Sequence, residues 1–135
     1  MKQIAILGST GSIGTQALDV CRHLGYSVVA TTANRDVDGI AAQAREFLPR
    51  YAVMYDKIAA ARLREELAGT GITVLEGEEG LCQAASMPEA ELVLNSLSGM
   101  VGLRPTLAAL EAGKTVALAN KETLVAGGRL ITDTA

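Results

Sequence analysis

Short apolar segments alternate with longer amphipathic segments along almost the whole chain. The apolar segments are aliphatic or β-branched and lie next to turn residues, so each predicts a strand. Six strands are expected, at residues 4–7, 26–32, 51–54, 72–75, 91–96 and 114–119. Between them, apolar positions recur at helical spacing, which predicts helices at residues 15–23, 37–48, 57–68, 77–86 and 104–112. A last helix is expected to open at residues 120–122 and to reach Asp133 or beyond.

Strands that alternate with helices form βαβ crossovers, which place parallel strands in one sheet. Leu92, Val93 and Leu94 are consecutive, as a strand buried on both faces requires. The sequence therefore predicts an α/β fold, a Rossmann-like doubly wound parallel sheet of about six strands with helices on both faces. Asp36 and Asp56 stand directly before the second and third helices, where each is expected to act as the N-cap.

The first strand runs into three glycines, Gly8, Gly11 and Gly14, and a helix follows at once. A strand, a glycine turn and a helix N-terminus in this order form a phosphate-binding corner, because the first helical amides have no partner within the helix. The hydroxyls of Ser9, Thr10 and Ser12 add polar groups. The spacing is G-x-x-G-x-x-G and not the usual G-x-G-x-x-G, so a tight turn without a ligand is the alternative. The context favours a dinucleotide bound at residues 8–14.

Composition limits the protein classes without naming a function. The 135 residues are 49% apolar, with three Tyr, one Phe and no Trp, which suits one domain (residues 1–135) with an aliphatic core. A net charge of −3 without a basic block gives no support to nucleic-acid binding. No apolar run could span a membrane, and the start of the chain enters the first strand directly, so a cytoplasmic protein is expected. Cys21 and Cys82 form no C-x-x-C motif and are expected to be reduced structural thiols.

The loop after the second expected strand favours NADP over NAD. Ligands of parallel sheets bind beyond the carboxyl ends of the strands, and an NAD site usually carries an acid about 20 residues past the glycine turn. Here Asn34 and Arg35 follow the strand, and the planar, permanently charged guanidinium of Arg35 suits a 2′-phosphate. Asp36 would repel that phosphate unless its carboxylate turns toward the helix N-terminus. The alternative for Arg35 is a solvated surface charge.

The residues Asn120, Lys121 and Glu122 follow the sixth expected strand. Asn suits an N-cap and Glu suits the first turn of a helix, yet Lys121 stands where a cation could reach a substrate oxygen. The residue types support a structural helix start and a substrate contact by Lys121 equally. His23 lies at the end of a helix and is expected to be structural, and the sequence shows no nucleophile–base pair and no metal cluster.

Four segments together carry a family resemblance that covers essentially the whole chain. The chain resembles the N-terminal domain of the 1-deoxy-D-xylulose 5-phosphate reductoisomerase family. The segments are Gly8-Ser-Thr-Gly-Ser-Ile-Gly14, Pro49-Arg-Tyr-Ala-Val53, Leu103-Arg-Pro-Thr-Leu107 and Ala119-Asn-Lys-Glu-Thr-Leu-Val125. The glycine motif is common to many reductases, and the last segment is the most particular of the four.

The resemblance implies the NADPH-binding domain of an oxidoreductase and isomerase of the non-mevalonate isoprenoid pathway. Such an enzyme converts 1-deoxy-D-xylulose 5-phosphate to 2-C-methyl-D-erythritol 4-phosphate with NADPH and Mg²⁺ or Mn²⁺, as a cytoplasmic and homodimeric protein. By motif position, the pyrophosphate would meet Thr10, Gly11, Ser12 and Ile13, and the adenosine 2′-phosphate would meet Asn34, Arg35 and Asp36. Asn120 and Glu122 would contact the nicotinamide side, and Lys121 the substrate. The family often has Asn where this chain has Asp36, which puts that contact in doubt.

The resemblance also implies that the catalytic and metal-binding residues lie outside this chain, which should then be inert alone. Residues 129–135 have neither a glycine cap nor a closing strand, which indicates a domain cut from a longer protein. One alternative is the cofactor domain of another Rossmann reductase, such as an aspartate-semialdehyde or homoserine dehydrogenase. A second alternative is a non-catalytic module that senses a dinucleotide and binds a partner.

Overall fold

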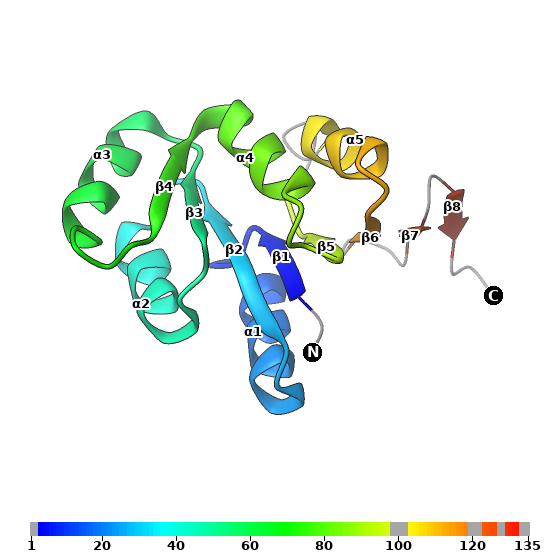
Figure 1. Ribbon diagram of the computed structural model, residues 1–135, viewed down its shortest axis with the longest axis horizontal. Coiled ribbons are helices and arrows are strands. Elements are labelled where there is room, and N and C mark those ends of the chain that lie inside the picture. The colour runs from blue at the N-terminus through cyan, green and yellow to red at the C-terminus, as the bar shows by residue number, and fades with distance from the viewer. Residues whose placement is uncertain (1–2, 98–102, 119–122, 127–128, 133–135) are drawn as a thin grey trace.

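The computed structural model describes residues 3–97, 103–118, 123–126 and 129–132 (Figure 1). Its helices are α1 (Ser12–Leu24), α2 (Val37–Phe47), α3 (Lys57–Glu66), α4 (Gly77–Ser86) and α5 (Leu103–Glu111). Its strands are β1 (Gln3–Leu7), β2 (Ser27–Ala33), β3 (Tyr51–Met54), β4 (Thr73–Glu76), β5 (Leu92–Asn95), β6 (Thr115–Leu118), β7 (Thr123–Ala126) and β8 (Arg129–Thr132). The first helix therefore begins at Ser12 and not at Thr15, because the glycine turn leads directly into its first turn.

All strands belong to one sheet with the order β4-β3-β2-β1-β5-β6-β7-β8. The pairs from β4 to β6 are parallel, which confirms the expected doubly wound sheet of six parallel strands. The chain winds outward from β1 to β4 and then crosses to the other side of β1 to form β5. The topological switch point, where ligands of such sheets bind, is therefore between β1 and β5, directly beyond the glycine turn.

Side chains alternate between the two faces of the sheet and build a core on each. On one face, Ile4 and Ile6 of β1 pack with Leu18 and Cys21 of α1. On the other, Ala5 and Leu7 belong to a cluster with α4 and α5, which contribute Leu81, Ala84, Ala85 and Ala109. Figure 1 shows α1 and α2 on one side of the strands and α4 and α5 on the other. Helices cover both faces, as the sequence predicts.

The expected last helix is wrong. Residues 123–126 and 129–132 form β7 and β8, which pair antiparallel from Thr123↔Thr132 to Ala126↔Arg129. β7 also pairs antiparallel with β6. Gly127 and Gly128 separate the two strands in the sequence, and two such glycines between aliphatic segments disfavour a helix and favour a hairpin. The free edge of β6 supplies the backbone partners of β7, and β7 supplies those of β8, so residues 129–132 are a strand and not the end of an uncapped helix.

Local features of the described chain agree with other expectations. The carboxylate of Asp36 accepts a hydrogen bond from the Gly39 amide (2.9 Å) and that of Asp56 from the Ala59 amide (2.9 Å), which confirms both N-caps. Cys21 is buried and Cys82 half-buried, and both are free thiols whose pKa is raised, chiefly by burial. None of the described helices is both long enough and apolar enough to cross a bilayer.

Candidate functional site

The turn after β1 needs glycine at two of its three glycine positions for reasons within the protein itself. Gly8 has a φ of +83°, which side-chain-bearing residues rarely adopt. A Cβ on Gly14 would lie 2.1 Å from the backbone oxygen of Gly8, so α1 packs on the turn only without that atom. Gly11 is different, because its φ is −75° and the nearest atom to its Cβ would be 3.8 Å away. Packing of the turn thus does not require glycine at 11, which suits the N-cap position and leaves room for the close approach of a ligand.

Neighbouring elements hold this turn in place through buried or half-buried hydrogen bonds. Near the end of β2, Oγ1 of Thr32 accepts a hydrogen bond from the Gly8 amide (2.7 Å), and the Thr32 carbonyl accepts one from the Ser9 amide (2.7 Å). The Gln43 side chain on α2 accepts from the Ser9 hydroxyl (2.6 Å) and donates to the Ser9 carbonyl (2.9 Å). Ser9 is fully buried, so its hydroxyl faces the protein and not a ligand. The Ser96 hydroxyl, after β5, donates to the carbonyl oxygens of Leu7 and Gly8.

The N-terminus of α1 differs from those of the neighbouring helices. Its N-cap, Gly11, supplies no side-chain hydrogen bond, and the first turn contains no acid. α2 and α3 are capped by aspartates, and the first turn of α4 contains Glu78 and Glu79. The positive end of the α1 dipole is therefore uncompensated by these means beside the open face of Gly11, an arrangement that suits an external anion. Gly11 and Ile13 are exposed there, Thr10 is half-buried, and Ser12 is the first residue of α1.

A second part of the site follows β2 and β3. A pocket of about 620 Å³ is lined by Ala33, Asn34, Arg35, Tyr55, Asp56, Lys57, Ile58, Leu81 and Leu97. The two chain segments continue side by side beyond the sheet, since the Tyr55 amide donates to the Ala33 carbonyl (2.9 Å) and the Asp56 amide to the Asn34 carbonyl (3.1 Å). The pocket thus combines two polar loops with apolar side chains from Leu81 and Leu97, a composition typical of small-molecule sites.

The orientation of Asp36 resolves the objection that the sequence raised against Arg35. The Asp36 carboxylate caps α2, and Gly39 leaves room for it, because a Cβ there would lie 2.3 Å from Oδ2. Arg35 is exposed on the pocket and forms no ion pair with any residue that the structure describes. Its guanidinium is therefore available to an anion, while direct contact of Asp36 or Asn34 with a ligand stays a prediction.

The third predicted part of the site, formed by Asn120, Lys121 and Glu122, lies outside the described residues. β6 ends at Leu118, shortly before it, and its carboxyl end lies on the same edge of the sheet as the glycine turn. In the described ranges, no group of three His, Cys, Asp or Glu side chains is placed to hold a metal ion.

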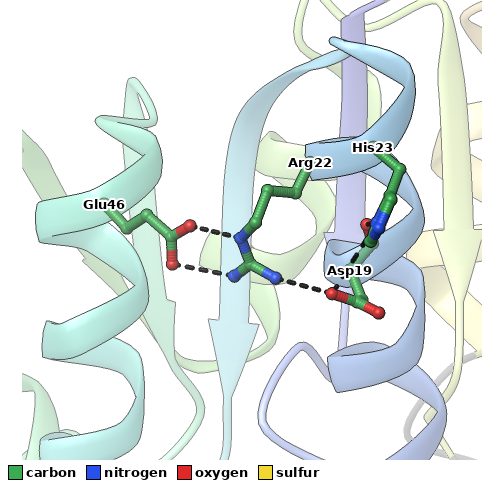
Figure 2. Close-up of polar contacts among 4 residues, drawn as sticks. All are labelled: Asp19, Arg22, His23 and Glu46. Atoms are coloured by element: carbon green, nitrogen blue, oxygen red, sulfur yellow. Dashed lines mark hydrogen bonds and ion pairs between the residues drawn. The ribbon is translucent and has the colours of Figure 1, made fainter.

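An ion-pair cluster joins the two helices that support the glycine turn (Figure 2). Arg22 at the end of α1 donates from Nε and Nη2 to both carboxylate oxygens of Glu46 on α2, and from Nη1 to Asp19. These hydrogen bonds raise the pKa of Arg22 and lower that of Glu46. The guanidinium also lies 5.2 Å from the Phe47 ring centroid. His23 donates from Nδ1 to the Asp19 carbonyl (2.9 Å), a helix-end contact that agrees with its expected structural role.

Sequence reasoning missed the residues that depend on contacts between elements. Lys57 was interpreted only as the first residue of a helix, although its position directly after β3 marked it as a candidate at the carboxyl edge. Gln43 carried a weaker signal, as a polar residue between the buried positions Ile40, Ala41 and Ala44 of α2. Thr32 and Ser96 end their expected strands at the carboxyl edge, but only the sheet order places them against the turn.

Comparison with known proteins gives one consistent family. A family model described as 1-deoxy-D-xylulose 5-phosphate reductoisomerase matches residues 4–128. The enzyme of that name from Halothermothrix orenii is 50% identical over 132 residues, which are 96% of this chain and 34% of that protein. The one from Symbiobacterium thermophilum is 53% identical over 137 residues, with 97% and 35% covered. The chain thus spans about a third of the length of these relatives.

Solved structures of the same name share the fold. A 1-deoxy-D-xylulose 5-phosphate reductoisomerase from Zymomonas mobilis in complex with NADPH superposes with a TM-score of 0.83 at 42% identity, over 90% of this chain and 32% of that one. A DOX-P reductoisomerase in complex with NADPH, fosmidomycin and magnesium gives a TM-score of 0.84 at 38% identity, over 90% and 31%.

Proposed function

This chain belongs to the 1-deoxy-D-xylulose 5-phosphate reductoisomerase family, and we propose that it is the NADPH-binding domain of such an enzyme. The observation that carries the proposal is the pairing of two anion sites on one sheet edge. One is the uncapped start of α1 beside the open Gly11, and the other is the pocket with the unpaired Arg35. A dinucleotide phosphorylated on its adenosine ribose has its pyrophosphate and its 2′-phosphate at such separate places.

In this proposal each part of the cofactor meets a different part of the chain. The pyrophosphate binds at the start of α1, to Thr10, Gly11, Ser12 and Ile13. Hydrogen bonds with Thr32 and Gln43 keep the turn there in one geometry. The loop with Asn34, Arg35 and Asp36 meets the adenosine 2′-phosphate. Asn120 and Glu122 contact the nicotinamide side, and Lys121 contacts the sugar phosphate substrate.

The parent enzyme would convert 1-deoxy-D-xylulose 5-phosphate to 2-C-methyl-D-erythritol 4-phosphate in the non-mevalonate isoprenoid pathway. When bound, the nicotinamide would supply a hydride, and Mg²⁺ or Mn²⁺ would polarise substrate oxygens. We assign the metal ligands and the remaining catalytic groups to the two thirds of the parent that this chain does not cover, so the chain alone should not turn over substrate. The proposal extends to a homodimeric parent in the cytoplasm, a reducing compartment in which two free thiols are expected.

The test is a titration of the purified chain with NADPH and with NADH, followed by nicotinamide fluorescence. NADPH should bind more tightly, and Arg35→Gln should weaken NADPH by about tenfold, the effect of one lost charge-assisted hydrogen bond, without changing NADH. Equal affinities of the wild-type chain for the two nucleotides would refute the role of Arg35. No binding of either nucleotide would refute the proposed function itself.

A further inference from the structure

The pocket beyond β2 and β3 contains a second unpaired cation besides Arg35. Lys57, the first residue of α3, lines the same pocket and forms no ion pair within the described part of the chain. Most arginines of that part do have carboxylate partners: Arg22 pairs with Glu46, Arg45 with Glu66, Arg50 with Glu89, Arg64 with Glu76, and Arg104 with Glu78. Arg35 and Lys57 thus line one pocket without a carboxylate partner, although the carboxylate of Asp56 also lines it.

The backbone explains why the two cations line one pocket. The ladder between β2 and β3 continues past the sheet to the hydrogen bond from the Asp56 amide to the Asn34 carbonyl (3.1 Å). Arg35 and Lys57 each follow this bonded pair by one residue, in two segments that run side by side. Backbone pairing thus places the main chains of both residues at one pocket.

The two carboxylates of the same loops are turned away from this role. Asp36 accepts from the Gly39 amide and Asp56 from the Ala59 amide, so each carboxylate is occupied at the start of its own helix. The pocket therefore has two N-capped helix starts beside it and two side-chain cations on it, with no carboxylate bound to either cation.

The helix dipole gives no reason for a lysine at position 57. A cation in the first turn opposes the helix dipole, and the only acid at the start of α3 is its N-cap, Asp56. Lys57 nevertheless stands at this position and lines the same pocket as Arg35. A ligand with more than one negative charge at this point would neutralise both cations.

We propose that Lys57 and Arg35 together bind the adenosine 2′-phosphate, so that Lys57 is a further determinant of the preference for NADPH. The inference rests on the proposed function and adds to it a residue outside the loop 34–36. A phosphate monoester has close to two negative charges at neutral pH, which one guanidinium only half neutralises. Arg35 supplies the planar, directional contact, and the ammonium of Lys57 supplies a compact second charge.

The test compares Lys57→Gln with a matched control, Arg62→Gln. Arg62 is an exposed cation of the same helix that does not line the pocket, so its loss changes the net charge equally. Lys57→Gln should weaken NADPH by about tenfold and leave NADH unchanged, since only NADPH has the 2′-phosphate. Arg62→Gln should change neither, and Lys57→Arg should retain most of the preference. Adenosine 2′,5′-bisphosphate, which lacks the nicotinamide, should lose affinity in parallel with NADPH.

The outcomes separate this inference from the function on which it rests. If the wild-type chain prefers NADPH but Lys57→Gln behaves like Arg62→Gln, or weakens NADH as much as NADPH, the role of Lys57 is refuted and the proposed function stands. If the wild-type chain binds neither nucleotide, both are refuted. Circular dichroism melts control for folding, and Lys57→Gln should melt no lower than wild type, because it removes a charge that opposes the helix dipole.

Discussion

Gly11 and Gly14 stand three residues apart in the same turn, and alanine should have opposite consequences at the two positions. At Gly14 the new Cβ would lie 2.1 Å from the Gly8 carbonyl oxygen and 2.6 Å from the Ser9 Cα, both backbone atoms. At Gly11 the nearest atom would be 3.8 Å away, an ordinary contact. Gly14→Ala therefore tests the packing of the turn, and Gly11→Ala tests the access of the ligand.

Two effects compete at Gly14. Alanine is the better helix former by about 1 kcal/mol, which would stabilise the first turn of α1. The overlap with backbone can be relieved only by moving the turn, and overpacking of this kind costs about 1–3 kcal/mol or more. The movement would also strain the bonds from Thr32 and Gln43, each worth about 1 kcal/mol. Since the steric terms exceed the propensity, Gly14→Ala should lower the free energy of unfolding by about 2–4 kcal/mol.

At Gly11 the backbone is already in a region that alanine adopts, with φ −75° and ψ 175°. Alanine is the poorer N-cap but also restricts the unfolded chain, and these effects leave the free energy of unfolding within about 1 kcal/mol of wild type. The methyl group would stand where the pyrophosphate approaches the helix amides. NADPH affinity should therefore fall by about tenfold or more, although the fold is intact.

Urea unfolding followed by circular dichroism measures the free energy of unfolding, and NADPH fluorescence titration measures the affinity for NADPH. Gly25→Ala is unsuitable as a control because Gly25 has a φ of +72°, so wild type is the reference for both variants. The reasoning is refuted if Gly14→Ala is as stable as wild type, or if Gly11→Ala binds NADPH with unchanged affinity.

Two further predictions concern stability alone. Thr31 is fully buried in β2 and its hydroxyl has no hydrogen-bond partner among the described residues, so Thr31→Val should raise the free energy of unfolding by about 1 kcal/mol, and a lower urea midpoint would contradict this. Because Arg22 lowers the pKa of Glu46, this pair stabilises the fold above the unfolded pKa of the carboxyl and loses the effect as pH falls through the folded pKa. Wild type should thus lose stability more steeply than Glu46→Gln between about pH 5 and pH 3, as urea midpoints at each pH will show.

Features of the fold that depend on residues close together in the sequence could be predicted from the sequence. The strand at residues 51–54 and the helix at 77–86 have the expected bounds, because turn residues punctuate both apolar patterns. Both aspartate caps were predictable, since a cap and the amide it accepts from are three residues apart. The expected last helix was wrong, because β7 pairs with the free edge of β6 and β8 pairs with β7. The local pattern of residues 120–133 does not reveal this pairing.

The sequence by itself determined the alternation of strands and helices, the glycine turn at the start of α1 and the choice of Arg35 as a candidate for the 2′-phosphate. These depend on periodicity, on backbone freedom and on residue chemistry, all of which are local. Only the tertiary structure decided which residues surround that candidate. The placement of β3 beside β2 brings Lys57 to the pocket that Arg35 lines, and the placement of β5 and α2 brings Ser96 and Gln43 to the turn. Such contacts join residues far apart in the chain, and the physical reason is that strand order is set by the packing of the whole sheet.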